Sequence, residues 1–165
     1  MQRHLVMNGD MVLAEDPAPG QVDQWLRDFY AEIGGHEFFL GLATAFYRLV
    51  AADDLLAPLF AGGLWERHAT RLAGHFDRMY GTPDRTEAWA PRLLTAHTRF
   101  LISHEHRAHW LDALREAGRQ ISAPEPLFSD FVATMVMATG DLMGVSRGAA
   151  ISRGESFDRF GVRRP

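Results

Sequence analysis

Residues 38–50 read FFLGLATAFYRLV, and this stretch decides the fold class of the protein. Its apolar side chains recur every three or four positions, which is the spacing of one buried face of a helix. A half-buried strand would instead alternate apolar and polar residues. The pattern therefore predicts an amphipathic helix whose buried face carries Phe38, Phe39, Leu42, Ala43, Phe46, Leu49 and Val50.

Similar patterns on both sides of this stretch predict further helices. The apolar spacing indicates helices over 21–33, 64–80, 103–117 and from Pro124 or Pro126 onward. Shorter helices are expected over 55–60, where Asp53 or Asp54 offers an N-cap, and around 91–97. No pair of strands with a period of two is evident, so the predicted fold class is all-α.

The ends of the chain differ from its middle. Residues 16–20 read DPAPG, a cluster of helix breakers, and residues 147–165 are rich in Gly and Arg. A chain of 165 residues suits one domain with a sizeable core. We therefore expect a flexible N-terminal arm over 1–20, one domain over 21–146 and a flexible C-terminal tail over 147–165.

The composition excludes several classes of site. The formal net charge is −4, which gives no electrostatic footprint for nucleic acid or an anionic membrane. The absence of cysteine excludes disulfides, zinc–thiolate sites, iron–sulfur clusters and covalent c-type haem. Neither a signal peptide nor an apolar run of membrane-spanning length is evident. We expect a cytoplasmic protein with no nucleic-acid or membrane partner.

The chain has eight histidines, so we compared their spacing with known metal motifs. No Glu has a His three residues later, which excludes a ferritin-like di-iron site. His36-Glu37 and His104-Glu105 lack the second His of a zinc protease motif. His106 and His109 could hold a surface metal, but a polar first turn of a helix is the stronger interpretation.

A haem pocket needs one His for the iron, an apolar slot and a few donors on the opposite side. Phe60 lies thirteen residues after Tyr47 of the Phe46-Tyr47 pair, and Phe100 and Trp110 follow His97 by three and thirteen residues. Across 29–115 this joint spacing resembles the truncated haemoglobins, particularly their second group. The resemblance extends to Phe29-Tyr30, Gly34-Gly35, Tyr80-Gly81-Thr82-Pro83, where Thr82 replaces a glycine, and Pro91-Arg92-Leu93.

The resemblance implies a shortened globin with two helix pairs around non-covalent haem b. It makes His97 the proximal iron ligand, with its other N–H donating to a carbonyl near Leu93. It places Phe60, Arg71, Leu72, Phe76 and Phe100 against the haem, and Tyr47, His68 and Trp110 beside the bound gas. Three of these roles have an alternative. His97 could only complement the dipole at a helix end, Trp110 could pack in the core, and Arg71 could lie in solvent. His75, seven residues after His68, is expected in packing or at the haem edge.

The expected function is reversible binding of oxygen, nitric oxide or carbon monoxide, with oxygen transport as one use. One alternative is redox chemistry, as nitric oxide dioxygenation or a peroxidase-like reaction, with an external electron donor. Another is a haem-free helical sensor or interaction module. His68 is expected to donate to the gas, although it could instead bind the empty sixth position of iron. The sequence does not decide whether the protein forms a homodimer.

Overall fold

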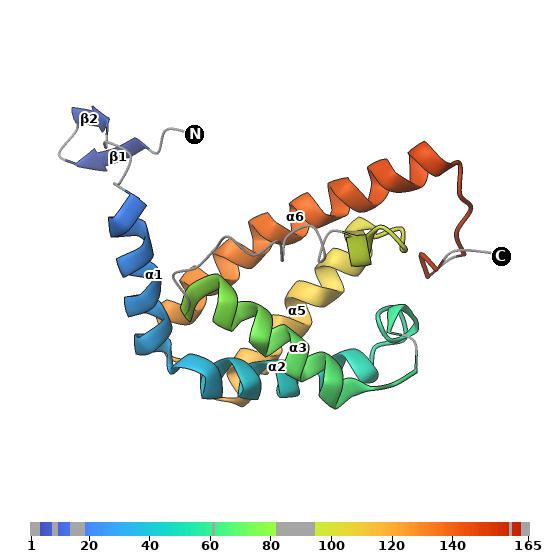
Figure 1. The fold of residues 1–165 in the computed structure, drawn as a ribbon, viewed down its shortest axis with the longest axis horizontal. Helices are drawn as coiled ribbons and strands as arrows, with labels where there is room; N and C mark the ends of the chain where they lie inside the picture. Colours follow the sequence, from blue (N-terminus) through green and yellow to red (C-terminus); the bar gives the residue numbers. More distant parts are fainter. Residues whose placement is uncertain are drawn as a thin grey trace.

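The computed structural model is built mainly of helices (Figure 1). It describes residues 4–7, 10–13, 19–60, 62–81, 95–158 and 160–162, with side chains from residue 24 onward. The long helices are α1 (Pro19–Ile33), α2 (Gly35–Ala51), α3 (Trp65–Phe76), α5 (His104–Gln120) and α6 (Leu127–Arg153). A 3-10 turn, η1 (Ala57–Leu59), follows α2, a π-helical turn, η2 (Asp77–Gly81), follows α3, and residues 95–97 are helical. The predicted all-α class is confirmed.

The corner between α1 and α2 depends on two adjacent glycines. Gly34 has φ 111° and Gly35 has φ 59°, both in the region that side chains with a Cβ rarely adopt. A Cβ added at Gly34 would also lie 3.1 Å from the Cβ of Phe38. The glycine pair therefore lets α1 end and α2 begin without a connecting loop.

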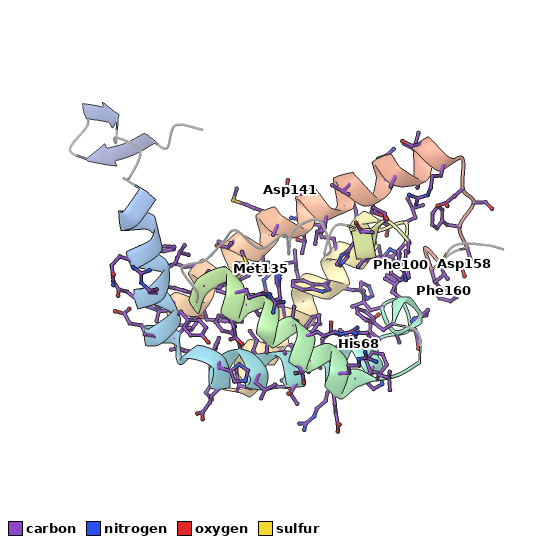
Figure 2. All side chains as sticks on the ribbon, in the orientation of Figure 1. His68, Phe100, Met135, Asp141, Asp158 and Phe160 are labelled. Atoms are coloured by element: carbon purple, nitrogen blue, oxygen red, sulfur yellow. The ribbon has the colours of Figure 1, made fainter. Side chains whose placement is uncertain are left out.

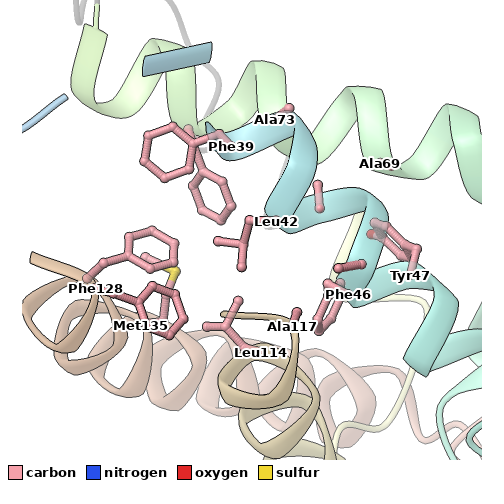
Figure 3. Close-up of a cluster of buried hydrophobic side chains, with 14 of the residues drawn as sticks. Phe39, Leu42, Phe46, Tyr47, Ala69, Ala73, Leu114, Ala117, Phe128 and Met135 are labelled. Atoms are coloured by element: carbon pink, nitrogen blue, oxygen red, sulfur yellow. The ribbon is translucent and has the colours of Figure 1, made fainter. Parts of the chain in front are cut away.

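The core lies where α2 is covered by α3 on one side and by α5 and α6 on the other (Figure 3). Phe39 of α2 packs on Phe76 of α3 and Phe131 of α6, with ring centroids 5.1 and 5.5 Å away. Leu42 and Leu114 are fully buried beside them. Complete burial of each such side chain contributes about 1.5–3 kcal/mol. The apolar face predicted over 38–50 is thus the centre of the molecule.

Two features differ from the sequence-based expectations. An antiparallel hairpin of β1 (His4–Met7) and β2 (Asp10–Leu13) precedes α1, although no strand pair was expected. The hairpin was not expected from the sequence because each strand has only four residues, too few for a clear period of two. The predicted domain boundary at 146 falls inside α6, which continues to Arg153 and ends at Gly154 with φ 60°. The division into arm, domain and tail otherwise stays a prediction.

None of the helices in the described ranges combines the length and apolar character that crossing a membrane requires.

Candidate functional site

Four segments bring aromatic rings together at one end of α2. Tyr47 of α2 lies 5.4 Å from Phe60, which follows η1, and 5.6 Å from His68 of α3, measured between ring centroids. Phe60 and His68 are 5.3 Å apart. Trp110 of α5 reaches the same end of α2 through Phe46, at 5.0 Å. The structure therefore brings Tyr47, Phe60 and His68 into direct contact, and Trp110 reaches Tyr47 only through Phe46.

The sequence analysis missed one member of this cluster, Trp65. Its ring lies 6.1 Å from Phe60 and 6.4 Å from both Tyr47 and His68. Trp65 precedes His68 by three residues on α3, so the two side chains share one face of the helix. That spacing was visible in the sequence and could have identified it.

Tyr47 is a neutral hydrogen-bond donor inside this cluster. Its side chain is only 8% exposed, and burial raises its pKa well above the ordinary value of 10.0. Neither the Tyr47 hydroxyl nor the Trp110 indole N–H hydrogen-bonds to any residue that the structure describes. Both groups are donors that a polar ligand could use.

His68 is also neutral near pH 7. Burial lowers its pKa below the ordinary 6.5, and the nearby guanidinium groups of Arg71 and Arg67 lower it further. A neutral imidazole has one N–H and one lone pair, so it can donate to a ligand or coordinate a metal. Both roles considered in the sequence analysis therefore remain chemically available.

A second group of residues surrounds His97, just outside the helices that form the aromatic cluster. His97 lies at the end of the helical residues 95–97 and is half-buried, and its carbonyl accepts a 3.3 Å hydrogen bond from the Phe100 amide. His75 of α3 lies within electrostatic range of His97. Burial lowers the pKa of His75 to about 4, with further contributions from Arg78 and His97. The last two turns of α3 therefore reach the segment that carries His97.

The other predicted haem contacts fall in different environments. Leu72 is half-buried against the core, whereas Arg71 is exposed. Phe76 is 1% exposed and packs within the core on Phe39 and Phe131. Their contacts with haem stay predictions. The residues around Thr82-Pro83 and Pro91-Arg92-Leu93, including the carbonyl expected to hold His97, lie outside the described residues.

Three of the other histidines are bound to protein groups, whereas His104 is exposed in the first turn of α5. His36 contacts Asp77 at 2.7 Å and His109 contacts Asp53 at 2.8 Å. His106 is 3% exposed and bonds to Ser103 and to the carbonyl of Phe160. A surface metal on His106 and His109 is therefore not supported. The polar first turn of a helix is found as predicted, with His106 buried within it. The described residues also contain no group of three or more His, Cys, Asp or Glu side chains suited to a metal ion.

Asp53 connects the turn before η1 with α5, although it is not the N-cap that was predicted, because η1 begins after Leu56 without a side-chain cap. Its carboxylate accepts hydrogen bonds from the amides of Leu55 and Leu56 at 2.9 and 2.8 Å, and it faces His109. Burial alone would raise the pKa of Asp53. The hydrogen bonds from His109 and the two amides outweigh it and hold the pKa below its ordinary value. The turn that leads to Phe60 is thereby fastened to α5 beside Trp110.

The chemistry of these donors fits a haem group. Haem needs a neutral imidazole on one face of the iron and an apolar site with a few neutral donors on the other. His97 can supply the first, and the cluster of Tyr47, Phe60, Trp65 and His68 supplies the second. A bare metal ion would need several anionic or imidazole ligands together, which the described residues lack.

Comparison with known proteins agrees with this chemistry. The bacterial-like globin family matches residues 28–140. The thermostable haemoglobin of the actinobacterium Thermobifida fusca is 31% identical, with 70% of this chain and 95% of that chain covered at a TM-score of 0.61. The haemoglobin of the phototrophic bacterium Chloroflexus aurantiacus is 30% identical, with 70% and 96% covered at a TM-score of 0.61. The group II truncated haemoglobin of Bacillus anthracis, 22% identical, shares the fold, with 70% and 88% covered at a TM-score of 0.60.

No curated protein matches the chain. The family match nevertheless spans α2, α3, α5 and the first half of α6, and so includes Tyr47, His68, His97 and Trp110. The chain therefore belongs to the bacterial-like globin family, and its structural relatives are truncated haemoglobins.

Proposed function

We propose that this globin holds haem b through His97 and binds a diatomic gas reversibly on the side of Tyr47, His68 and Trp110. The observation that carries the proposal is the buried Tyr47, a neutral donor among aromatic rings whose hydroxyl has no hydrogen-bond partner in the described part of the chain. When bound, haem would supply the iron at which oxygen, nitric oxide or carbon monoxide attaches.

The assignment of His97 as the proximal ligand is supported by the other histidines. His36, His106 and His109 each bond to a carboxylate, hydroxyl or carbonyl elsewhere in the fold. His68 lies in the aromatic cluster with Tyr47. His97 is half-buried on a separate segment, between α3 and α5, and the proposal assigns it to the face of the haem away from that cluster.

The chain's own groups would hold the gas. A Tyr47 hydroxyl in an apolar site donates to a ligand atom that carries partial negative charge, and water competes little for that bond. The Trp110 indole can only donate, which suits the same task. Leu72, one turn after His68, would restrict the size of the ligand. Arg71 would pair with a haem propionate from the exposed side of α3.

The test is an absorption spectrum of the purified protein and of two histidine variants. Wild type should show an intense near-ultraviolet haem band, and His97→Ala should lose most of its haem. His104→Ala is the matched control, because His104 is exposed in the first turn of α5 and should leave the spectrum unchanged. Full haem content and an unchanged ferrous spectrum in His97→Ala would contradict the assignment.

Reaction of the oxygenated protein with nitric oxide separates gas carriage from redox chemistry. Slow reaction supports reversible binding, whereas rapid oxidation to nitrate supports nitric oxide dioxygenation with an external electron donor. A protein that takes up no haem would be a helical sensor or interaction module instead. The proposal includes a cytoplasmic location, which rests on the composition alone.

A further inference from the structure

The end of the chain folds back onto the segment that carries His97 (Figure 1). After Gly154 ends α6, Asp158 holds Phe160 and Val162 through hydrogen bonds. Its carboxylate accepts from the amides of Phe160 and Val162, both at 2.9 Å, and its own amide donates to the Val162 carbonyl at 2.9 Å. We call residues 153–162 the C-terminal strap. This strap lies wholly outside the stretch that matches the globin family, residues 28–140.

The strap holds the residues that follow His97. The Leu101 amide donates to the Gly161 carbonyl at 2.9 Å, and Phe100 and Val162 form an antiparallel bridge. Figure 2 shows Asp158 and Phe160 at the same end of the molecule as Phe100. The guanidinium of Arg153 also donates to the carbonyl of Thr98, the residue next to His97. The backbone from 98 to 101 is thus fixed by the strap at three points.

His106 connects the strap to the start of α5. Its Nδ1 accepts a 3.1 Å hydrogen bond from the Ser103 amide, so in the neutral ring the proton is on Nε2. Nε2 then donates to the Phe160 carbonyl at 3.0 Å. One imidazole therefore caps α5 and fastens the strap, and this explains why His106 is buried.

The fit between the strap and the loop leaves no room for a larger residue at 161. Gly161 has φ 72°, and a Cβ there would lie 2.3 Å from the Leu101 carbonyl oxygen and 3.1 Å from His106 Cε1. From the other side, Ser146 of α6 donates to the Phe100 carbonyl at 2.6 Å and accepts from the Ile102 amide at 2.9 Å. The loop after His97 is therefore clamped between α6 and the strap.

We propose that the C-terminal strap is a positioning segment for the proximal histidine. By holding Thr98, Phe100 and Leu101 it sets where the His97 imidazole stands relative to the haem iron, and so the strength and orientation of the iron–histidine bond. This inference rests on the proposed function, because it takes His97 as the iron ligand. The strap itself touches neither haem nor gas.

Two pairs of variants test the proposal in the haem-loaded, full-length protein. Gly161→Ala should push the strap off the loop, whereas Gly148→Ala, whose added Cβ meets nothing within 4 Å, is its control. His106→Asn keeps an acceptor for the Ser103 amide but loses the donor to Phe160. His106→Gln places an amide donor near the position of Nε2 and should retain the strap.

Two measurements are made on each variant. Hydrogen exchange of the peptide over 98–102 reports release of the loop, and the iron–histidine stretching band of the ferrous protein reports the position of His97. Gly161→Ala and His106→Asn should speed exchange about tenfold or more and shift or broaden the band. Gly148→Ala and His106→Gln should resemble wild type. Ile33→Val in α1 controls for general loss of stability and should leave the band unchanged.

Each remaining result is decisive. If the loop exchanges faster but the band is unchanged, the strap does not position His97. If neither variant speeds exchange, the whole strap is removed directly by truncation after Ser152. Unchanged exchange over 98–102, or an unchanged iron–histidine band, in that truncated protein also overturns the proposal. Loss of the band in His97→Ala keeps the proposed function intact in all these cases. Retention of the band in His97→Ala overturns the ligand assignment instead.

Discussion

Replacement of Tyr47 by Phe removes one hydroxyl and leaves the packing of the ring in place. With 8% of the side chain exposed, little water can take over the lost hydrogen bond to the gas. Such a bond to a partly charged acceptor contributes about 1.5–3 kcal/mol, and each 1.4 kcal/mol is about a tenfold change in rate. Because Trp110 and His68 stay as donors, we expect the lower part of this range, an oxygen release about tenfold faster.

Stopped-flow displacement of oxygen by excess carbon monoxide measures that rate. Release of carbon monoxide, which is less polar when bound, should change much less. Tyr30→Phe is the matched control: its hydroxyl donates to Asp77 at 2.8 Å, far from the cluster, so its loss should leave gas release unchanged. If Tyr47→Phe accelerates the release of oxygen and of carbon monoxide equally, Tyr47 acts sterically. An unchanged rate of oxygen release would refute its role as a donor.

Three further predictions concern the site and the fold. The pKa of His68 is lowered below its ordinary value, so any change in oxygen release caused by its protonation should have its midpoint below about pH 6.5. The unliganded ferrous protein should be five-coordinate, and a six-coordinate spectrum that His68→Ala abolishes would establish His68 as an internal ligand. The folded-state pKa of Asp53 is depressed, so its contribution to stability is present above the unfolded pKa and lost as pH falls through the folded value. Asp53→Asn should therefore lower the free energy of unfolding at pH 7 by about 1 kcal/mol. In urea titrations this difference between wild type and variant should shrink below about pH 4. An equal difference at pH 3 would contradict the prediction. Gly118→Ala would place a Cβ 2.1 Å from the ring of Phe128 and should lower the free energy of unfolding by about 1–3 kcal/mol. Gly144→Ala is the control: its added Cβ has nothing within 4 Å, so the same titration should show equal or greater stability.

Local pattern was enough to predict the helices, and the resemblance to a family predicted part of the site. The apolar face of 38–50 is buried as expected. The pairing of Tyr47 with Phe60, whose rings lie 5.4 Å apart, came instead from the resemblance to the truncated haemoglobins. Both involve residues close in sequence or on one helix face. His106 could not be placed in this way, because its burial depends on Phe160, 54 residues away. Nothing local to residues 104–109 indicates that contact.

The extent of α6 was misjudged for a related reason. Gly140, Gly144 and Gly148 lower helix propensity by about 1 kcal/mol each relative to Ala, and the sequence around them resembles a tail. The helix continues because Ser146 is fully buried and bonds to the backbone of the loop after His97. Tertiary contacts of this kind outweigh propensity, and only the structure reveals them.

Along α3 and η2 the charged side chains and the neutral histidines lie on different sides, an arrangement that suits the binding of haem. Arg67, Arg71 and Arg78 are all exposed, whereas His68 and His75 face inward with lowered pKa values. His68 and His75 are seven residues apart, which is about 10 Å along one face of a helix. This face therefore runs from the Tyr47 cluster to the neighbourhood of His97 without presenting a charged group near pH 7. Because the pKa of His75 is lowered to about 4, its imidazole is neutral over the physiological range and adds no positive charge near the segment that carries His97.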